Sequence, residues 1–462
     1  MPENLNDIRQ IVIKLLASGS PEKFQLFIKK YHEADIAEAL QELSSQDRQN
    51  FFLKVNPELS TDVLEELTID QQVDIISKSQ IKDAAKIIEE MHPDDAADLF
   101  EELLETNEDK AEEIMNALPD KEQSELKSLL SYEEDSAGSL MTSDYLSIPE
   151  NLSIHESLAV IKQQNPPDSE VSFYIFIVSK ANNLKGYITL RDLIMTPLKS
   201  KVKDLRVEYP INVHYSADQE EVTKLFQKYN MSVIPVIDDD ERLLGVITVD
   251  DVVDVMIEEA NEDVFKLSGT VTESEEKLIS GSIFRTLLYR TPWLLITIIG
   301  GLVASFVITE YSLLFKEHLF SLALSLSFVP LLMGLGGNVG NQSSAIIVRG
   351  LATGTVSLKN SFSILFREIV VGLSIGLVIA LFLFLTNHYL SDYSLVFSVI
   401  VSVALLSNII VATFLGTALP LIFNRFNIDP AVASAPFISS ALDVIGQVIY
   451  FSITLFVLQT LI

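Results

Sequence analysis

The distribution of apolar residues divides the chain into two parts. After about residue 283, long apolar runs follow one another, each near the ~20 residues that a membrane-spanning helix needs. The uncharged runs are Thr291–Thr309, Leu319–Val348, Ile369–His388 and Tyr393–Asn424, and a fifth run, Pro430–Ile462, is interrupted once by Asp443. The pattern predicts five transmembrane helices over residues 283–462, preceded by a soluble region.

Residues 1–135 show amphipathic helical periodicity throughout, with a coarse internal repeat. Leu43, Leu67 and Met91 each close an amphipathic segment, 24 residues apart. A turn with an acidic residue follows each of them, at the positions Asp47, Asp70 and Asp94. Repeats of this length predict a short superhelix of helix pairs.

The periodicity changes over residues 136–258 to two copies of strand, polar turn, strand and helix. Gly186 matches Gly245, Thr189 matches Thr248, and Asp192 matches Asp251, all at an offset of 59. This tandem resembles a pair of CBS domains, with the first expected at 136–199 and the second at 200–258. The predicted fold class is therefore multi-domain, α plus α/β: a helical superhelix, tandem CBS domains and a five-helix transmembrane domain.

A strongly acidic helix follows the second α/β repeat. Seven acids and no Lys or Arg stand between Asp250 and Asp263, beside an apolar stripe at helical spacing. Like charges three or four residues apart destabilise a helix. A solvated face relieves part of that repulsion, and divalent cations shared with another acidic element would relieve more. Both interpretations stay open from this helix alone, and residues 259–282 are expected to connect it to the first span.

The two parts differ in charge as well as in hydropathy. Residues 1–280 hold 58 acidic and 26 basic residues, whereas residues 281–462 hold six and seven. Such acidity disfavours nucleic acid as a partner and favours cations. There is no cysteine, which excludes disulfides and thiolate chemistry, and the polar start MPENLNDIRQ does not resemble a cleaved signal peptide.

The basic residues around the predicted spans predict the orientation in the membrane. Arg285 and Arg290 precede span one, three basic residues lie between spans two and three, and Arg425 lies between spans four and five, whereas the opposite loops hold only Lys316. The positive-inside rule then places the N-terminus in the cytosol and the C-terminus outside, in a multi-pass protein of the plasma membrane.

The stretch PLLMGLGGNVGNQSS, Pro330–Ser344, is unusual for a span because it carries four glycines and three amides. Glycines permit a helix break or a close helix approach. Amide oxygens and freed carbonyls would suit a hydrated cation. In span five, Asp443 is the only charge inside the predicted spans, and an intramembrane carboxylate is functional by default. Mg²⁺ keeps several waters and is bound through one or two carboxylates, so two copies of Asp443 at a dimer axis would suit it.

These segments together resemble the MgtE family of Mg²⁺ channels and transporters along essentially the whole chain. The matching pieces are MHPDDAADL, the CBS pair, VDDVVDV, GGNVGNQSS and DPAVASAPFISSALDVIGQVIYF, in family order. The resemblance implies a homodimer embedded in membrane lipid, importing Mg²⁺ along its axis. It also implies closure by cytosolic Mg²⁺ through a plug helix, and an adenine nucleotide as a candidate ligand of the CBS pair.

The resemblance also assigns roles to individual residues. The pore acid would be Asp443 and the acid at the pore mouth Asp429. The segment lining the pore would contain Gly336, Gly337, Asn338, Asn341 and Gln342. The regulatory Mg²⁺ ligands would be Asp62, Asp94, Asp98, Asp251, Asp254, Glu259, Glu262 and Asp263. Where relatives carry an acid near the end of the ADQEEVTKLFQKYN helix, this chain has Asn230, so one regulatory site is in doubt.

Four other classes of function compete with this one. An anion channel would need a cationic or hydroxyl-rich pore. A proton-coupled divalent-cation carrier regulated by CBS domains remains the alternative, although no second intramembrane acid or histidine completes a proton relay. A membrane-tethered sensor leaves Asp443 without a purpose. An enzyme is disfavoured, because no nucleophile–base set, P-loop or histidine cluster is evident in the sequence.

Overall fold

The structure is a computed structural model that describes residues 5–18, 21–164, 173–205, 211–270, 283–315, 319–391 and 393–461. It separates into two compact units, residues 1–256 and 257–462, which are described in turn.

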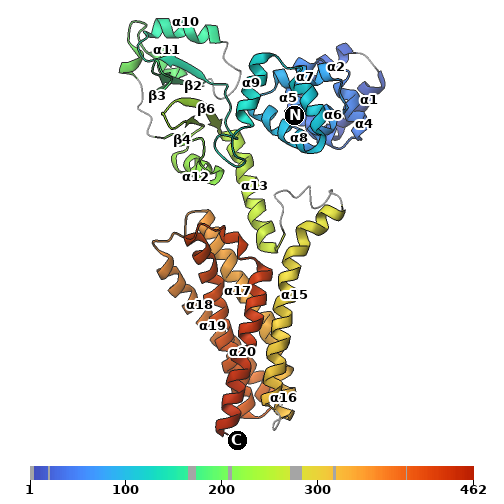
Figure 1. Ribbon diagram of the computed structural model, residues 1–462, viewed down its shortest axis with the longest axis vertical. Helices are drawn as coiled ribbons and strands as arrows, with labels where there is room; N and C mark the ends of the chain where they lie inside the picture. Colours follow the sequence, from blue (N-terminus) through green and yellow to red (C-terminus); the bar gives the residue numbers. More distant parts are fainter. Residues whose placement is uncertain are drawn as a thin grey trace. The chain divides into compact units, whose positions relative to one another are not determined.

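The first part of unit 1 is all helical, as predicted (Figure 1). Helix α3 packs on α1 and α5, α4 on α6, α5 on α7, and α6 on α8. Each of these helices therefore contacts the next but one in the chain. This pattern is typical of stacked helix pairs and agrees with the predicted superhelix. In chain order the helices are α1 (Leu5–Ser18), α2 (Pro21–Ile28), α3 (Glu33–Gln41), α4 (Ser45–Phe52), α5 (Pro57–Glu65), α6 (Ile69–Lys78), α7 (Ile81–Glu90), α8 (Pro93–Met115) and α9 (Asp120–Leu129).

The acidic turns of the repeat are helix starts. Asp47, Asp70 and Asp94 lie in the first turns of α4, α6 and α8, where a carboxylate interacts favourably with the positive end of the helix dipole. At α4 the Ser44 hydroxyl accepts a hydrogen bond from the Asp47 backbone N–H at 3.2 Å. Apolar side chains from α1 to α9 form one continuous core, which explains why such short helices are stable together.

The tandem repeat forms two three-stranded sheets of the same topology. In each, the first strand pairs parallel with the second, and the second pairs antiparallel with the third. Gly186 lies opposite Ile177 and Gly245 lies opposite Val236, again at an offset of 59. The elements are β1 (Leu146–Pro149), α10 (Ile154–Gln164), β2 (Tyr174–Val178), β3 (Leu184–Thr189), α11 (Leu190–Met195), η2 (Val202–Asp204), β4 (Val213–His214), α12 (Gln219–Tyr229), β5 (Val233–Ile237), β6 (Leu243–Thr248) and α13 (Val249–Ser268).

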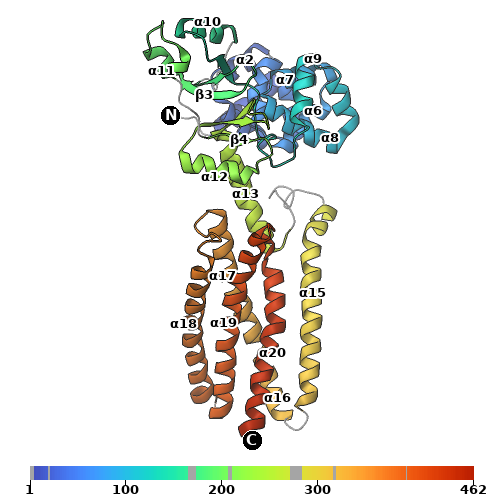
Figure 2. The same cartoon turned by 60° about the vertical axis from the view of Figure 1, so that its left-hand side comes forward.

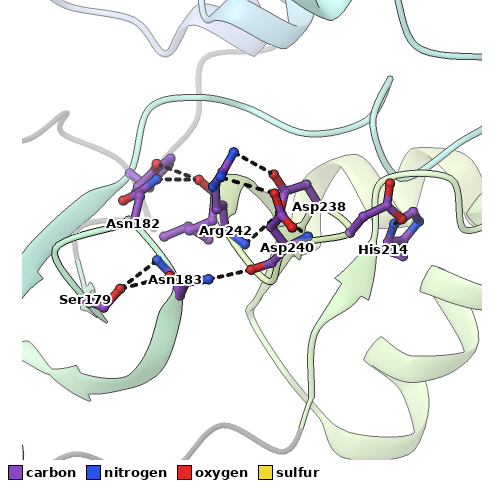
Figure 3. Close-up of polar contacts among 10 residues, drawn as sticks. Ser179, Asn182, Asn183, His214, Asp238, Asp240 and Arg242 are labelled. Atoms are coloured by element: carbon purple, nitrogen blue, oxygen red, sulfur yellow. Dashed lines mark hydrogen bonds and ion pairs between the residues drawn. The ribbon is translucent and has the colours of Figure 1, made fainter.

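The β2–β3 and β5–β6 turns of the two repeats bind each other (Figure 3). The Leu184 N–H donates to the Glu241 carbonyl at 3.0 Å, and the Leu243 N–H donates to the Asn182 carbonyl at 2.9 Å. Asn182 and Glu241 occupy equivalent positions, and both are left-handed, with φ of 63° and 60°. The reciprocal pattern gives the pair an internal two-fold relation, as expected for paired CBS domains.

Within its described residues, unit 2 contains the end of α13 and five long apolar helices, each long enough to span a membrane. Helix α17 packs against α19 and α20, α18 packs against α19, and α15 packs against α20. Figure 2 shows these helices side by side, with the short α16 at the end where the C-terminus lies. Their bounds are α15 (Ile283–Leu314), α16 (Leu319–Leu326), α17 (Val329–Ala352), α18 (Ser361–Leu385) with η3 (Thr386–Leu390), α19 (Leu395–Arg425), η4 (Pro430–Val432) and α20 (Ala435–Leu461).

Two expectations about the spans need correction. Helix α17 runs unbroken through the glycines, so the helix break and the freed carbonyls do not occur. The glycines instead allow close helix approach, since a Cβ on Gly416 of α19 would lie 2.2 Å from the Gly340 carbonyl oxygen. The helices are also longer than the uncharged runs, so Asp443 is not the sole charge within them, and α15 includes Glu310 near its end.

The end of α13 is held within unit 2. Gly269 follows the helix with φ of 77°, a conformation that favours glycine. A Cβ at this position would lie 2.5 Å from Pro436 of α20 and 3.4 Å from the Cβ of Trp293 on α15. The predicted connecting segment 259–282 is therefore helical as far as Ser268, and its residues 271–282 lie outside the described residues.

Candidate functional site

Asp443 lies on α20 beside a small pocket between three helices. The side chains around the pocket are Val329, Leu332, Met333, Asn408, Leu442, Asp443, Gly446, Gln447 and Tyr450. Asp443 is half-buried, and helices α17, α19 and α20 all contribute to its surroundings. A carboxylate at the meeting point of three spans is the arrangement expected of an intramembrane functional site.

Amide side chains near Asp443 donate their hydrogens to the protein and leave their oxygens without partners. Asn408 is 1% exposed, and its Nδ2 donates to the Leu332 carbonyl at 2.9 Å. The Gln447 Nε2 points at the Met333 sulfur at 3.4 Å. The oxygens of both side chains are buried and have no hydrogen-bond partner among the described residues. Buried oxygens without donors are costly unless a water or a cation satisfies them.

Asn341 repeats this arrangement on the α17–α20 interface. Its Nδ2 donates to the Ser439 hydroxyl at 3.2 Å, and its buried Oδ1 has no partner within the described part of the chain. Ser439 and Asp443 are four residues apart on α20 and so share one face. Asn341 therefore contacts the face that carries Asp443, whereas Asn338 and Gln342 lie on the exposed side of the single chain.

The two pore-segment glycines make room for these side chains. A Cβ on Gly336 would lie 2.8 Å from the Asn408 Nδ2, and a Cβ on Gly337 would lie 3.3 Å from the Ser439 hydroxyl oxygen. Both glycines are buried against neighbouring helices. Asn408 was missed from the sequence, because a single amide in a long apolar helix carries no local motif. Gln447 was not singled out although it lies in the quoted stretch that contains Asp443.

Asp429, predicted at the pore mouth, is bound to a lysine. Its Oδ2 accepts a hydrogen bond from the Lys266 Nζ at 2.7 Å, and its Oδ1 accepts one from the Ala431 backbone N–H at 2.8 Å. Lys266 also pairs with Glu262 at 2.5 Å. Burial acts to lower the pKa of Lys266, but the hydrogen bonds to Asp429 and Glu262 outweigh it and raise the pKa. The ammonium is therefore charged.

Lys266 thus takes the place of a cation between two acids that were predicted to bind Mg²⁺. It is the sole basic residue of α13, a signal that was visible in the sequence, although its partner Asp429 lies 163 residues away. Glu259 and Asp263, also predicted as ligands, are half-buried on the same stretch of α13.

In unit 1 the structure brings Asp94, Asp95 and Asp251 together. The pKa of Asp94 is raised to about 7 by burial and by Asp95, and its Oδ1 is buried without a partner among the described residues. The pKa of Asp251 is raised to about 7 by burial and by Asp94. That of Asp95 is raised to about 8 by burial, Glu65 and Asp251. Carboxyl groups that raise one another's pKa form a region of negative potential that favours cations.

Asp251 also has a structural role. Its carboxylate accepts hydrogen bonds from the Thr248 hydroxyl and from the Thr248 N–H at 3.4 Å, which caps α13. Asp192 does the same at the start of α11, where it binds Thr189. The matched aspartates at offset 59 are therefore explained first by capping, and the neighbouring Asp94 is what distinguishes Asp251.

The other predicted regulatory acids lie around this group. Burial and Glu65 raise the pKa of Asp62, while burial and Asp250 raise that of Asp254. Asp98 is exposed and contributes to the raised pKa of Asp95. Asn230 has a conformational role: with φ of 50° it ends α12 in the left-handed conformation, which asparagine tolerates better than most residues.

A histidine also belongs to this region and was not predicted. Glu65, His92 and Asp95 place one ligand atom each within 4.8 Å of one another, and we call them the Glu65–His92–Asp95 cluster. The His92 Nδ1 lies 3.3 Å from the Glu65 Oε1 and 3.9 Å from the Asp95 Oδ2. The hydrogen bond to Glu65 raises the pKa of His92 to about 9, against the opposing effect of burial.

Comparison with known proteins covers both units. The family described as "Divalent cation transporter", MgtE, matches residues 329–453, the MgtE intracellular N domain matches 31–135, and CBS domains match 137–198 and 202–258. The magnesium transporter MgtE of Thermus thermophilus is 35% identical over 347 residues, 75% of each chain.

Two further similarities extend the coverage. The magnesium transporter MgtE of Bacillus subtilis is 28% identical over 443 residues, 96% of this chain and 95% of its own. A solved structure described as the cytosolic domain of the Mg²⁺ channel MgtE in complex with ATP is 29% identical, with a TM-score of 0.50. It covers 53% of this chain and 98% of the solved one. The described residues form five apolar helices long enough to span a membrane, and Asp443 lies where three of them meet. The chain is therefore a multi-pass membrane protein, and it belongs to the MgtE family, whose members are magnesium transporters and not enzymes.

Proposed function

We propose that the chain is a Mg²⁺-selective channel that imports Mg²⁺ past Asp443 and is closed by Mg²⁺ bound to its acidic N-terminal unit. The observation that carries the proposal is a set of buried amide oxygens without hydrogen-bond partners among the described residues. Those of Asn408 and Gln447 belong to the Asp443 pocket, and that of Asn341 belongs to an amide that binds Ser439 on the same face of α20. Oxygen ligands with few carboxylates suit Mg²⁺, which retains part of its water shell.

The exposed amides of α17 support assembly as a homodimer. Asn338 and Gln342 lie four residues apart on the exposed side of an apolar helix, where lipid could not satisfy their hydrogen bonds. A second copy of the chain, with an aqueous path along the shared axis, would provide those partners. Two copies of Asp443 facing that path would balance the charge of one Mg²⁺.

Closure by Mg²⁺ is supported by the mutual repulsion of the acids in unit 1. Asp95 raises the pKa of Asp94, Asp94 raises that of Asp251, and Asp251 raises that of Asp95. A bound cation would stabilise this compact arrangement. A ligand that binds one conformation better shifts the population toward it. Asp62, Asp98, Asp254, Glu259, Glu262 and Asp263 remain candidates for additional regulatory ligands.

The orientation and the nucleotide are part of the same proposal. The basic residues at the ends of the spans support a cytosolic N-terminus and an external C-terminus in the plasma membrane. The ATP complex of a related cytosolic domain supports an adenine nucleotide as a ligand of the CBS pair. These features would place both regulatory ligands on the cytosolic side.

Flux in liposomes tests the transport path. We predict that Asp443→Asn reduces Mg²⁺ flux at least tenfold while leaving assembly intact, because it removes the charge that the amide oxygens cannot replace. Glu310→Gln is the control, since Glu310 is an exposed acid on α15. Wild-type flux through assembled Asp443→Asn protein would reject the path. Flux that follows an imposed proton gradient would favour the proton-coupled carrier.

A further inference from the structure

His92 occupies a helix-capping position but does not act as a cap. It is the residue before α8, and its side chain makes no hydrogen bond to the first turn of that helix. His32 holds the same position before α3, and its Nδ1 accepts from the Ala34 N–H at 3.4 Å. The His92 ring is instead directed at two carboxylates, those of Glu65 and Asp95.

The distances from the His92 Nδ1 to the two carboxylates are close to those of a tetrahedral metal site. Zn²⁺ takes nitrogen and oxygen ligands at about 2.0–2.2 Å, so two ligands of one ion lie roughly 3.3–3.5 Å apart. The 3.3 Å between His92 Nδ1 and Glu65 Oε1 already satisfies this requirement. The 3.9 Å to Asp95 requires a shift of roughly half an ångström, within reach of one rotatable carboxylate.

The backbone holds the cluster in place. The His92 N–H donates to the Glu65 Oε1 at 2.8 Å, which orients that carboxylate independently of the imidazole. Asp95 lies three residues after His92 in the first turn of α8, so the helix fixes their separation. Hydrogen bonds that orient ligands contribute strongly to metal affinity.

The site is accessible from solvent, and the residue next in sequence to one ligand has an unsatisfied carboxylate oxygen. The side chain of Glu65 is 13% exposed, whereas those of His92 and Asp95 are 48% and 44% exposed, so an ion can enter from solvent. Next in sequence to Asp95, the buried Asp94 Oδ1 has no hydrogen-bond partner in the described ranges. Asp94 interacts electrostatically with both Asp95 and His92, so its carboxylate adds negative potential to this region.

We propose that Glu65, His92 and Asp95 form a binding site for a divalent transition metal such as Zn²⁺ or Co²⁺. The imidazole nitrogen is the reason for this choice, because imidazole suits Zn²⁺ and its neighbours in the periodic table, while Mg²⁺ prefers oxygen ligands alone. Three protein ligands leave a fourth position for water. The inference does not depend on the proposed Mg²⁺ channel.

Cobalt binding to the full-length protein in detergent tests the site. Protein stripped with chelator is titrated with Co²⁺ at pH 8, where few protons compete with the metal and the bound ion displaces the proton that the imidazole still carries. Excess Mg²⁺ is present throughout to occupy sites built of oxygen alone. We expect about one Co²⁺ per chain by equilibrium dialysis, with the visible absorption of a tetrahedral site.

Two variants decide the outcome. His92→Gln should lower Co²⁺ affinity at least about tenfold and abolish the visible band, whereas His32→Gln should leave both unchanged. Asp95→Asn is a second test that leaves the imidazole in place, and circular dichroism checks that each variant is folded. An unaltered band in folded His92→Gln protein, or complete displacement of Co²⁺ by Mg²⁺, would overturn the proposal. Neither result bears on flux through Asp443.

Discussion

At the scale of single residues, Lys266 changes the interpretation of two predicted Mg²⁺ ligands. Its ammonium lies between Asp429 and Glu262, two acids that the sequence had suggested as Mg²⁺ ligands. A cation supplied by the chain itself neutralises these acids without Mg²⁺. Lys266 therefore serves as a tether between the end of α13 and the start of the last span.

Replacing Lys266 tests this tether. Lys266→Gln leaves Asp429 and Glu262 without their shared cation, so their repulsion should release α13 and raise Mg²⁺ flux several-fold at a fixed internal Mg²⁺ concentration. Lys359→Gln, in an exposed loop of the same unit, is the control. Liposome flux is the measurement, and equal flux in wild type and Lys266→Gln would contradict the tether.

Asp251 and Asp192 offer a matched pair for testing regulation. Both carboxylates cap a helix in the same way, but only Asp251 lies beside Asp94. Asp251→Asn should shift inhibition by cytosolic Mg²⁺ to several-fold higher concentration, because a ligand charge is lost. Asp192→Asn should not shift it. Patch-clamp recording with stepped Mg²⁺ measures both, and an identical curve for the two variants would leave Asp251 a capping residue only.

The individual residues differ in how far the sequence could predict them. Asp443 was identifiable because a charge in an apolar run stands out. Asn408 was not, since its importance comes from contacts with Leu332 and Gly336 on another helix. Glu65 ends α5 and His92 precedes α8, 27 residues later, and the spacing of the repeat does not show that they meet. Tertiary packing supplied this information.

At the scale of elements, the conformation of α17 is a feature that the sequence could not predict. Glycines in an apolar run are compatible with a broken helix or with close packing, and composition alone does not separate the two. The partners decide: Gly416 on α19 lies against the Gly340 carbonyl, and Gly340 lies against Leu442 and Ile438 of α20. The number of spans, by contrast, followed directly from hydropathy, because each exceeds the length a bilayer requires.

Alanine substitution separates packing glycines from tolerant ones. Gly416→Ala would place a methyl group 2.2 Å from a backbone oxygen, so we expect a loss of roughly 1–3 kcal/mol or more in folding stability. Gly334→Ala meets nothing within 4 Å and should be neutral or stabilise α17 by up to roughly 1 kcal/mol. Thermal unfolding in detergent compares them, and equal melting temperatures would argue against close packing at Gly416.

At the scale of the whole molecule, the charge of the chain makes its stability depend on pH. The pKa values of Asp94, Asp95 and Asp251 rise from 3.8 to about 7, 8 and 7 on folding. The folded state therefore binds protons more tightly than the unfolded chain, and stability falls as pH rises from about 4 to 8. His92, raised from 6.5 to about 9, acts in the same direction between those values.

Mg²⁺ should compensate for the protons that are lost. We predict that saturating Mg²⁺ raises the melting temperature of the N-terminal unit more at pH 8 than at pH 6, because protons compete for the same carboxylates. Calorimetry with and without Mg²⁺ at the two pH values measures the difference. Potassium at equal ionic strength is the control for screening. An equal Mg²⁺ effect at both pH values would show that these carboxylates are not its ligands.

The packing of Gly269 has a practical consequence. Trp293, the only tryptophan in the sequence, lies against this glycine at the end of α13, and its indole nitrogen is buried. The fluorescence of an indole depends strongly on its surroundings, so a displacement of α13 would alter the emission of the native protein. Trp293 is thus an intrinsic fluorescent probe at the end of α13 that carries the Lys266 tether, and its emission can be followed during a Mg²⁺ titration without any attached dye.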